Sequence, residues 1–210
     1  MITKELIHTF EKFIRSLSLD FTRRPKEFGY RNPALILADA VLSINRNYKY
    51  FVMPRITLLE QSNISSFENL IAKIEKIGAD GFCELWRYNH KSRVELLHIL
   101  ATRFMIIRKD MKARTDLNAL HQWGKITQPG DFRDFNVPGI GFTTFQYLRM
   151  MCGANTVKPD VHISKAILLG TGERLSAIDK VNLVEQTAVS MGIQAQDLDY
   201  ALWHFYSNKK

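Results

Sequence analysis

Apolar residues recur with the period of an α-helix along almost the whole chain, and no segment alternates apolar and polar residues as a strand does. The longest periodic segment covers residues 92–111, and another, over residues 34–43, is apolar on nearly every side. A helix that is apolar all round is expected in the interior of a domain. The sequence therefore predicts an all-α fold with residues 34–43 near the centre of its core.

Capping residues, glycines and prolines divide the periodic pattern into separate helices. Asn32–Pro33 has the form of an N-cap followed by a proline at the first helical position. Ser65 and Ser92 each precede a glutamate by three residues, which is the spacing of a capping box. Gly78 is the expected end of one helix and Ser176 the expected cap of another. The expected helices cover residues 2–19, 33–43, 48–60, 66–77, 92–111, 116–124, 142–152, 160–169, 178–191 and 196–207.

Composition limits the classes to which the protein can belong. The chain of 210 residues has 46% hydrophobic and 24% charged residues, which is typical of a folded globular protein. No run of about eighteen apolar residues predicts a membrane span. Two distant cysteines, Cys83 and Cys152, indicate a reduced, cytoplasmic compartment. The net charge of +8 favours a polyanionic partner, and the scattered histidines show no metal-ligand spacing.

A glycine turn directly before a helix is the first functional signal. Residues 137–141 read VPGIG, and an apolar-periodic segment with Thr143 in its first turn follows. Glycine leaves no Cβ in the way of an approaching ligand, while the amides and the positive end of the helix dipole favour an anion. The sequence predicts a phosphate-binding site at Pro138, Gly139, Ile140, Gly141 and Thr143.

The second signal is Asp160 in the sequence KPDVH, at the start of another apolar-periodic segment. One interpretation is structural, because aspartate is among the preferred N-cap residues and satisfies the free amides of the first helical turn. The other interpretation is catalytic. Residue chemistry alone leaves both open.

PGIG followed by a helix, a small-residue break and then PDVHI resembles the helix-hairpin-helix DNA glycosylases, the endonuclease III and AlkA superfamily. The resemblance implies that the amides of the hairpin bind a DNA phosphate and that Asp160 is the catalytic carboxylate. His162 falls on the family's histidine, and Lys165 stands where the family usually has arginine. The segment LSIN resembles the family's L-S-x-[NQ] element, so Asn45 would enter the DNA; a helix end and turn is the alternative for Asn45.

Two departures from the family pattern refine the expected activity. Thr143 occupies the position of the lysine that forms a Schiff base in bifunctional members, which implies a monofunctional enzyme; Lys158 and Lys165 are alternatives for a displaced lysine. The chain after Cys152 contains no cysteine, so the family's iron–sulfur cluster is not expected. The resemblance allows a monovalent ion at the hairpin carbonyls, and no other cofactor is expected.

The resemblance implies two helical lobes, residues 30–153 and residues 1–29 with 154–210, and an active cleft between them. The resulting hypothesis is a monomeric, monofunctional DNA glycosylase that acts on double-stranded DNA and removes a flipped damaged or modified base. The alternative is a non-catalytic DNA-binding protein of the same fold, in which Asp160 is only a cap. No local motif identifies the base or separates DNA from RNA. Trp86, Tyr88, Trp123 and Trp203 are candidate aromatic walls for a base, with core packing as the alternative.

Overall fold

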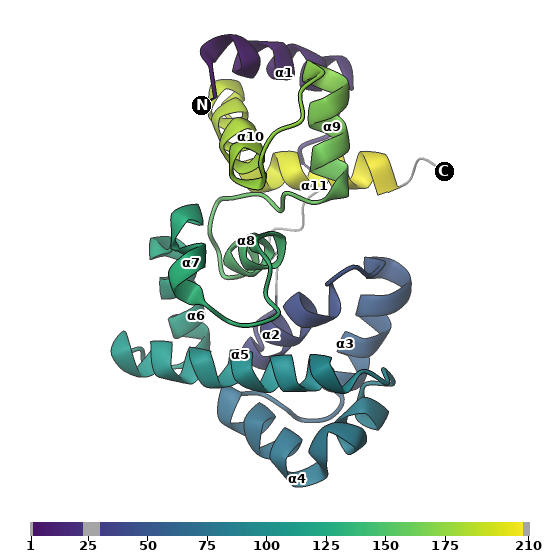
Figure 1. Cartoon of the computed structure of the whole chain (residues 1–210), viewed down its shortest axis with the longest axis vertical. Coiled ribbons are helices and arrows are strands. Elements are labelled where there is room, and N and C mark those ends of the chain that lie inside the picture. Colours follow the sequence, from purple (N-terminus) through teal and green to yellow (C-terminus); the bar gives the residue numbers. More distant parts are fainter. Residues whose placement is uncertain (1, 23–29, 208–210) are drawn as a thin grey trace. The chain divides into compact units, whose positions relative to one another are not determined.

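The computed structural model describes residues 2–22 and 30–207 (Figure 1). These residues form eleven α-helices, a π-helical turn and a 3₁₀ turn, with no strand among them, so the predicted all-α class is confirmed. Within the same ranges, no helix has the length and apolar character needed to cross a membrane. Contacts divide the chain into two compact units, Gly29–Gly153 and Met1–Phe28 with Ala154–Lys210.

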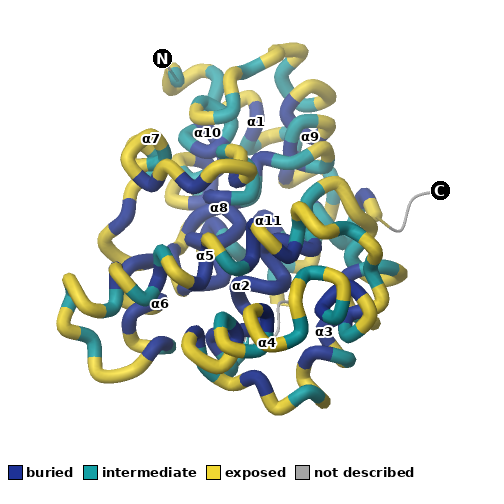
Figure 2. Tube along the Cα trace, turned by 60° about the horizontal axis from the view of Figure 1, so that its bottom comes forward, coloured by how far each residue is buried: buried dark blue, intermediate teal, exposed yellow. Residues whose placement is uncertain are grey.

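The unit Gly29–Gly153 is built around α2 (Pro33–Leu42). All ten residues of α2 are buried, as Figure 2 shows by its dark blue colour, and the predicted central helix is thus confirmed. Helices α5 (Lys91–Asp110) and α8 (Phe142–Met151) both pack against α2. The other elements of this unit are η1 (Tyr48–Val52), α3 (Met53–Glu60), α4 (Phe67–Leu85), α6 (Asp116–Ile126), η2 (Pro129–Asp131) and α7 (Phe132–Phe135).

The one charged residue of α2, Asp39, is fully buried and is surrounded by hydroxyl donors. Its carboxylate accepts hydrogen bonds from Tyr30 Oη at 2.6 Å, Ser43 Oγ at 2.8 Å and Tyr147 Oη at 2.9 Å. Tyr30 Oη also lies 3.1 Å from Tyr48 Oη. A buried carboxylate is costly unless it is well hydrogen-bonded, and this network meets that requirement. It also ties α2 to α8 and to the start of η1.

Helix α8 is fixed against α6 by a buried arginine and by a close backbone approach. Arg149 donates from Nε and Nη2 to the carbonyl of Thr127, the C-cap of α6, and from Nη1 to Gln146. A Cβ at Gly124 would collide with the carbonyl oxygen of Cys152, so only glycine allows the two helices to approach this closely. The helix that follows the glycine turn is therefore held rigidly.

The described residues of the second unit form four helices: α1 (Lys4–Ser16), α9 (Val161–Thr171), α10 (Ala177–Met191) and α11 (Ala195–Ser207). Helix α1 packs against both α9 and α10, and α11 packs against α9 and α10. Phe10 and Ile14 of α1 have no exposed surface. The N-terminal helix α1 and the C-terminal helices thus share one core.

Most predicted helix boundaries agree with the structure, but two predicted caps are wrong. Ser66, not Ser65, caps α4 and accepts from the Asn69 amide at 3.0 Å. Ser92 lies inside α5, which begins at Lys91, and its hydroxyl lies 3.0 Å from Nδ1 of His90 instead. In both places the capping-box spacing was present one or two residues away from the real start. Short segments η2 and α7 also fall where no helix was predicted.

Candidate active site and nucleic-acid interface

The predicted glycine turn is a β-turn. Its closing hydrogen bond runs from the Ile140 amide to the Val137 carbonyl at 3.0 Å. Gly139 has φ +90°, and a proline before a glycine with positive φ is the pattern of a type II turn. Val137 and Ile140 are buried while Pro138 and Gly139 are exposed. The apolar side chains therefore anchor the turn and leave its tip open to a partner.

Helix α8 begins immediately after this turn, with Gly141 as its N-cap. Gly141 contributes no capping side chain, and the first helical hydrogen bond runs from the Phe145 amide to the Gly141 carbonyl at 2.9 Å. A Cβ on Gly141 would meet no atom within 4 Å, so the space beside this residue is open. Thr143 lies half-exposed in the first turn. This arrangement suits an anion that approaches the backbone closely.

Asp160 is the N-cap of α9, as its structural interpretation predicted. Its Oδ1 accepts from the His162 amide at 2.8 Å and from the Ile163 amide at 3.3 Å. No described residue forms a hydrogen bond with its second oxygen, Oδ2, and the residue is half-buried. Capping thus uses one oxygen of the carboxylate. The two interpretations of Asp160 are therefore compatible, because the other oxygen can face a substrate.

Hydrogen bonds on both sides hold the backbone at Asp160. Its amide donates to the Lys158 carbonyl at 2.7 Å, which closes a tight turn around Pro159. Its carbonyl accepts from the Ser164 hydroxyl at 2.7 Å, and Ser164 in turn accepts from Lys180 Nζ of α10 at 2.9 Å. A carboxylate on a backbone fixed in this way is pre-organised, which is what a catalytic group requires.

Asp199 of α11 is a second carboxylate beside this turn, and no sequence motif indicated it. It is buried, and its Oδ1 accepts from the Lys158 amide at 2.9 Å. Burial raises the pKa of Asp199 to about 7, and the nearby charge of Asp160 adds to the rise. Gln196, one turn earlier on α11, donates to the Ala154 carbonyl at 2.6 Å. Helix α11 therefore fixes the segment that leads to Asp160.

The remaining predicted residues are distributed over both units. His162 is half-buried and contributes its amide to the Asp160 cap. Lys165 is exposed, and its Nζ lies 5.1 Å from the ring centroid of Tyr206, in the same unit. Asn45 lies in the turn after α2 with φ +56°, exposed to solvent. Asp160, His162 and Lys165 thus share one unit, whereas Asn45 and the glycine turn belong to the other.

The aromatic candidates separate into core and surface residues. Trp86 and Trp123 are buried, and Trp123 packs against Phe135 and Phe145 in an aromatic cluster, so both are core residues. Tyr88 and Trp203 are half-buried. Of the four candidates, only these two keep an accessible surface. The alternative of core packing therefore holds for Trp86 and Trp123.

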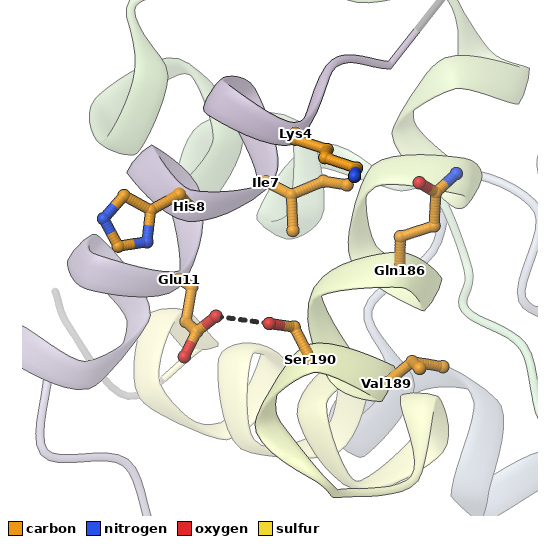
Figure 3. Close-up of a pocket in the computed structure, with 7 residues that line it drawn as sticks. All are labelled: Lys4, Ile7, His8, Glu11, Gln186, Val189 and Ser190. Atoms are coloured by element: carbon orange, nitrogen blue, oxygen red, sulfur yellow. Dashed lines mark hydrogen bonds between the residues drawn. The ribbon is translucent and has the colours of Figure 1, made fainter.

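Two further features were considered as sites, a set of metal ligands and a surface groove. Over residues 2–22 and 30–207, no three His, Cys, Asp or Glu side chains come together as a metal-ligand set. A surface groove between α1 and α10 contains none of the predicted residues (Figure 3). Ser190 donates to Glu11 across it at 2.6 Å, and this hydrogen bond and Arg15 lower the pKa of Glu11. The groove thus holds an internal helix–helix contact.

Comparison with known proteins gives one match. The model of a domain of unknown function (DUF8548) matches residues 135–207. This segment begins just before the glycine turn and ends with α11, so it contains both Asp160 and Asp199, while Asn45 lies outside it. No curated protein and no solved structure matches the chain significantly.

Proposed function

We propose that this protein is a monofunctional DNA glycosylase with the two-lobed helix-hairpin-helix fold, which hydrolyses the bond between a flipped base and its deoxyribose. The single observation that supports the proposal best is that Asp160 caps α9 through Oδ1 alone, on a backbone held from both sides. Lys180 of α10, through Ser164, and Asp199 of α11, through the Lys158 amide, add to this support. The second oxygen is available for chemistry.

The hydrolysis step itself requires mainly this carboxylate from the protein. As the N-glycosidic bond breaks, its electron pair leaves with the base, and positive charge develops at C1′ of the sugar. The negative charge of Asp160 stabilises that transition state. Water then adds to C1′, and Asp160 accepts the proton that the water loses. The base must first leave the stack, which costs a few kcal/mol and requires contacts that hold the opened DNA.

The glycine turn supplies one such contact. Exposed Gly139 and Gly141 let a phosphate oxygen approach the amides at the start of α8, where the helix dipole is positive. Such a contact fixes the position of the DNA without reading its sequence. Asn45, in the same unit as the glycine turn, is proposed to contact the opened base pair.

A displaced lysine nucleophile receives less support. Thr143 cannot form an imine, and Lys165 lies over the ring of Tyr206. The backbone amide of Lys158 is bound to Asp199, and the charge of Lys158 counteracts the rise in the pKa of Asp199. We propose hydrolysis by water over a Schiff-base route because threonine stands at the position of the family's lysine.

The test is base release from labelled duplexes that carry a panel of damaged bases, with the wild type beside Asp160→Asn, with and without alkali. Asparagine keeps the capping oxygen, so the variant should fold and bind an abasic analogue but release no base. Release by the wild type alone, with strand breaks only after alkali, is the expected result. Breaks without alkali would show a lyase lysine. Binding without release by either protein would favour the non-catalytic DNA-binding alternative.

A further inference from the structure

Two arginines share one aromatic platform on the unit Gly29–Gly153. The rings of Phe51, in η1, and Tyr88, after α4, pack edge to face with centroids 4.8 Å apart. The guanidinium of Arg55 lies 3.6 Å from the Phe51 ring centroid, and that of Arg46 lies 5.2 Å from it. Both also lie within 6 Å of the Tyr88 ring, at 5.7 and 5.6 Å. We call these four residues the arginine patch.

Neutral acceptors hold both guanidinium groups in place. Arg46 donates to the Asn45 carbonyl at 3.2 Å and to the Tyr88 hydroxyl at 3.1 Å. Arg55 donates to the Phe51 carbonyl at 2.9 Å and to the Arg87 carbonyl at 3.0 Å. These bonds restrict the side chains without using up their charge. Pre-organised arginines lose less entropy when they bind a ligand.

The patch has no acidic partner among the described residues. Arg15, Arg108 and Lys91 each form an ion pair with a carboxylate at 2.7–2.8 Å, whereas Arg46 and Arg55 form none within residues 2–22 and 30–207. Burial lowers the pKa of Arg55, and the adjacent charge of Arg46 lowers it further. Two like charges side by side repel each other, and an anion that binds between them would relieve that repulsion.

Further cations and an exposed ring border the patch. Arg87 and Lys49 are exposed, and Lys49 Nζ lies 5.5 Å from the ring centroid of Tyr50. Tyr50 is 76% exposed, which is unusual for a large aromatic residue. Asn45, predicted to enter the DNA, directly precedes Arg46. Cations interleaved with aromatic side chains are typical of surfaces that bind a nucleic-acid strand.

We propose that the arginine patch binds the phosphodiester backbone of nucleic acid, with Arg46 and Arg55 each contacting a phosphate. The choice of DNA as the ligand rests on the proposed function, whereas phosphate binding rests on the arrangement of the two arginines. Planar guanidinium groups match phosphate oxygens in a bidentate geometry. Because the turn after α2, η1, α3 and the segment after α4 each contribute one residue, the site is formed only by the folded unit.

The experiment measures the affinity of the full-length protein for a fluorescent undamaged duplex at several salt concentrations. The slope of log affinity against log salt is negative. Arg46→Gln should make it shallower by about one, because each phosphate contact releases about one counterion. Arg55→Gln should act in the same direction. Lys76→Gln is the matched control, since Lys76 is an exposed cation of α4 in the same unit, outside the patch. Thermal melting checks that each variant folds.

The outcomes separate this proposal from the catalytic one. A shallower salt dependence in Arg46→Gln than in Lys76→Gln supports phosphate binding by the arginine patch, even if the wild type releases no base from any duplex. Equal slopes in the two variants overturn it, even if base release is intact. Unchanged duplex binding together with Arg46-dependent binding to phosphatidylserine vesicles would also overturn it and assign the patch to membranes.

Discussion

Asp199 and Asp160 lie on different helices of one unit, yet the charge of Asp160 helps to raise the pKa of Asp199. Asp199 binds the Lys158 amide at 2.9 Å, two residues before Asp160, so a buried carboxyl group and the candidate catalytic group share one turn. Below about neutral pH, Asp199 keeps its proton and adds no negative charge beside Asp160. The turn thus has a group whose charge changes close to pH 7.

The first prediction concerns the pH dependence of stability at Asp199. Its pKa rises from 3.8 to about 7 on folding, so the folded state holds a proton that the unfolded chain has released between those values. The contribution of Asp199 to the free energy of unfolding is therefore complete below its unfolded pKa. It is lost as pH rises to about 7, by at most about 1.4 kcal/mol per pH unit.

Asp199→Asn isolates this contribution, because asparagine can still accept from the Lys158 amide but does not titrate. Urea unfolding of the wild type and the variant at several pH values gives the difference in their free energies of unfolding. We expect the stability of the wild type relative to the variant to fall between about pH 4 and pH 7 and to level off above. A difference that stays constant with pH would mean that Asp199 is ionised in the folded protein.

The second prediction separates the two roles of Asp160. Asp160→Ala removes the capping oxygen and should lower the free energy of unfolding by about 1 kcal/mol, while Asp160→Asn should change it little. Both variants should lose base release if the second oxygen is catalytic. Chemical unfolding and the release assay on the same protein samples measure the two effects. Base release retained by Asp160→Asn would restrict Asp160 to its capping role.

How far the sequence predicts this structure depends on whether a feature is local. Asn32 caps α2 through a 2.9 Å bond to the Ala34 amide, and Ser176 caps α10, both as predicted, because caps depend on a few neighbouring residues. Gly78 has φ +69° and interrupts α4 at the predicted end, although a short helical stretch follows. Where two serines compete, as at Ser65 and Ser66, local spacing is ambiguous and the prediction failed.

The non-local features escaped prediction. Asp199 looks like any polar residue of an amphipathic helix, and only the fold brings it to the Lys158 amide, 41 positions away in sequence. The arginine patch likewise joins Arg46 to Tyr88, which are 42 positions apart. The residue pattern predicted Asp160 as a cap and the resemblance implied its catalytic role, while its use of a single oxygen follows only from the structure. Burial and pairing depend on tertiary packing, which one sequence does not reveal.

The third prediction uses the different surroundings of the two turn glycines. Gly141 has φ −80° and open space at its Cβ position, so Gly141→Ala should fold normally and lose affinity for undamaged duplexes only by blocking the phosphate. Gly139 has φ +90°, so Gly139→Ala combines strain with any loss of binding. Gly141→Ala is therefore the cleaner variant for an anisotropy measurement. If it binds duplex as tightly as the wild type, the turn does not contact DNA.

The fourth prediction tests the buried network that holds α2 against α8. Tyr147 is buried and donates to Asp39 at 2.9 Å. Burial, and then the charge of Asp39, raise the pKa of Tyr147, so its hydroxyl remains a donor across the physiological range. Tyr147→Phe removes this hydrogen bond to a charged group and should lower the free energy of unfolding by about 1.5–3 kcal/mol. Tyr50→Phe is the matched control, because Tyr50 is 76% exposed.

The same network links stability to DNA binding, because Tyr147 belongs to the helix that begins at the glycine turn. Loosening α8 should weaken duplex binding in Tyr147→Phe, although the substituted residue is buried and makes no contact with DNA. Urea unfolding followed by circular dichroism compares the stability of the two variants, and anisotropy compares the duplex binding of Tyr147→Phe with that of the wild type. If Tyr147→Phe matched Tyr50→Phe in stability, the Asp39 hydroxyl network would contribute nothing to holding α8. If Tyr147→Phe lost stability as predicted but bound duplex as tightly as the wild type, the glycine turn would keep its geometry independently of that network.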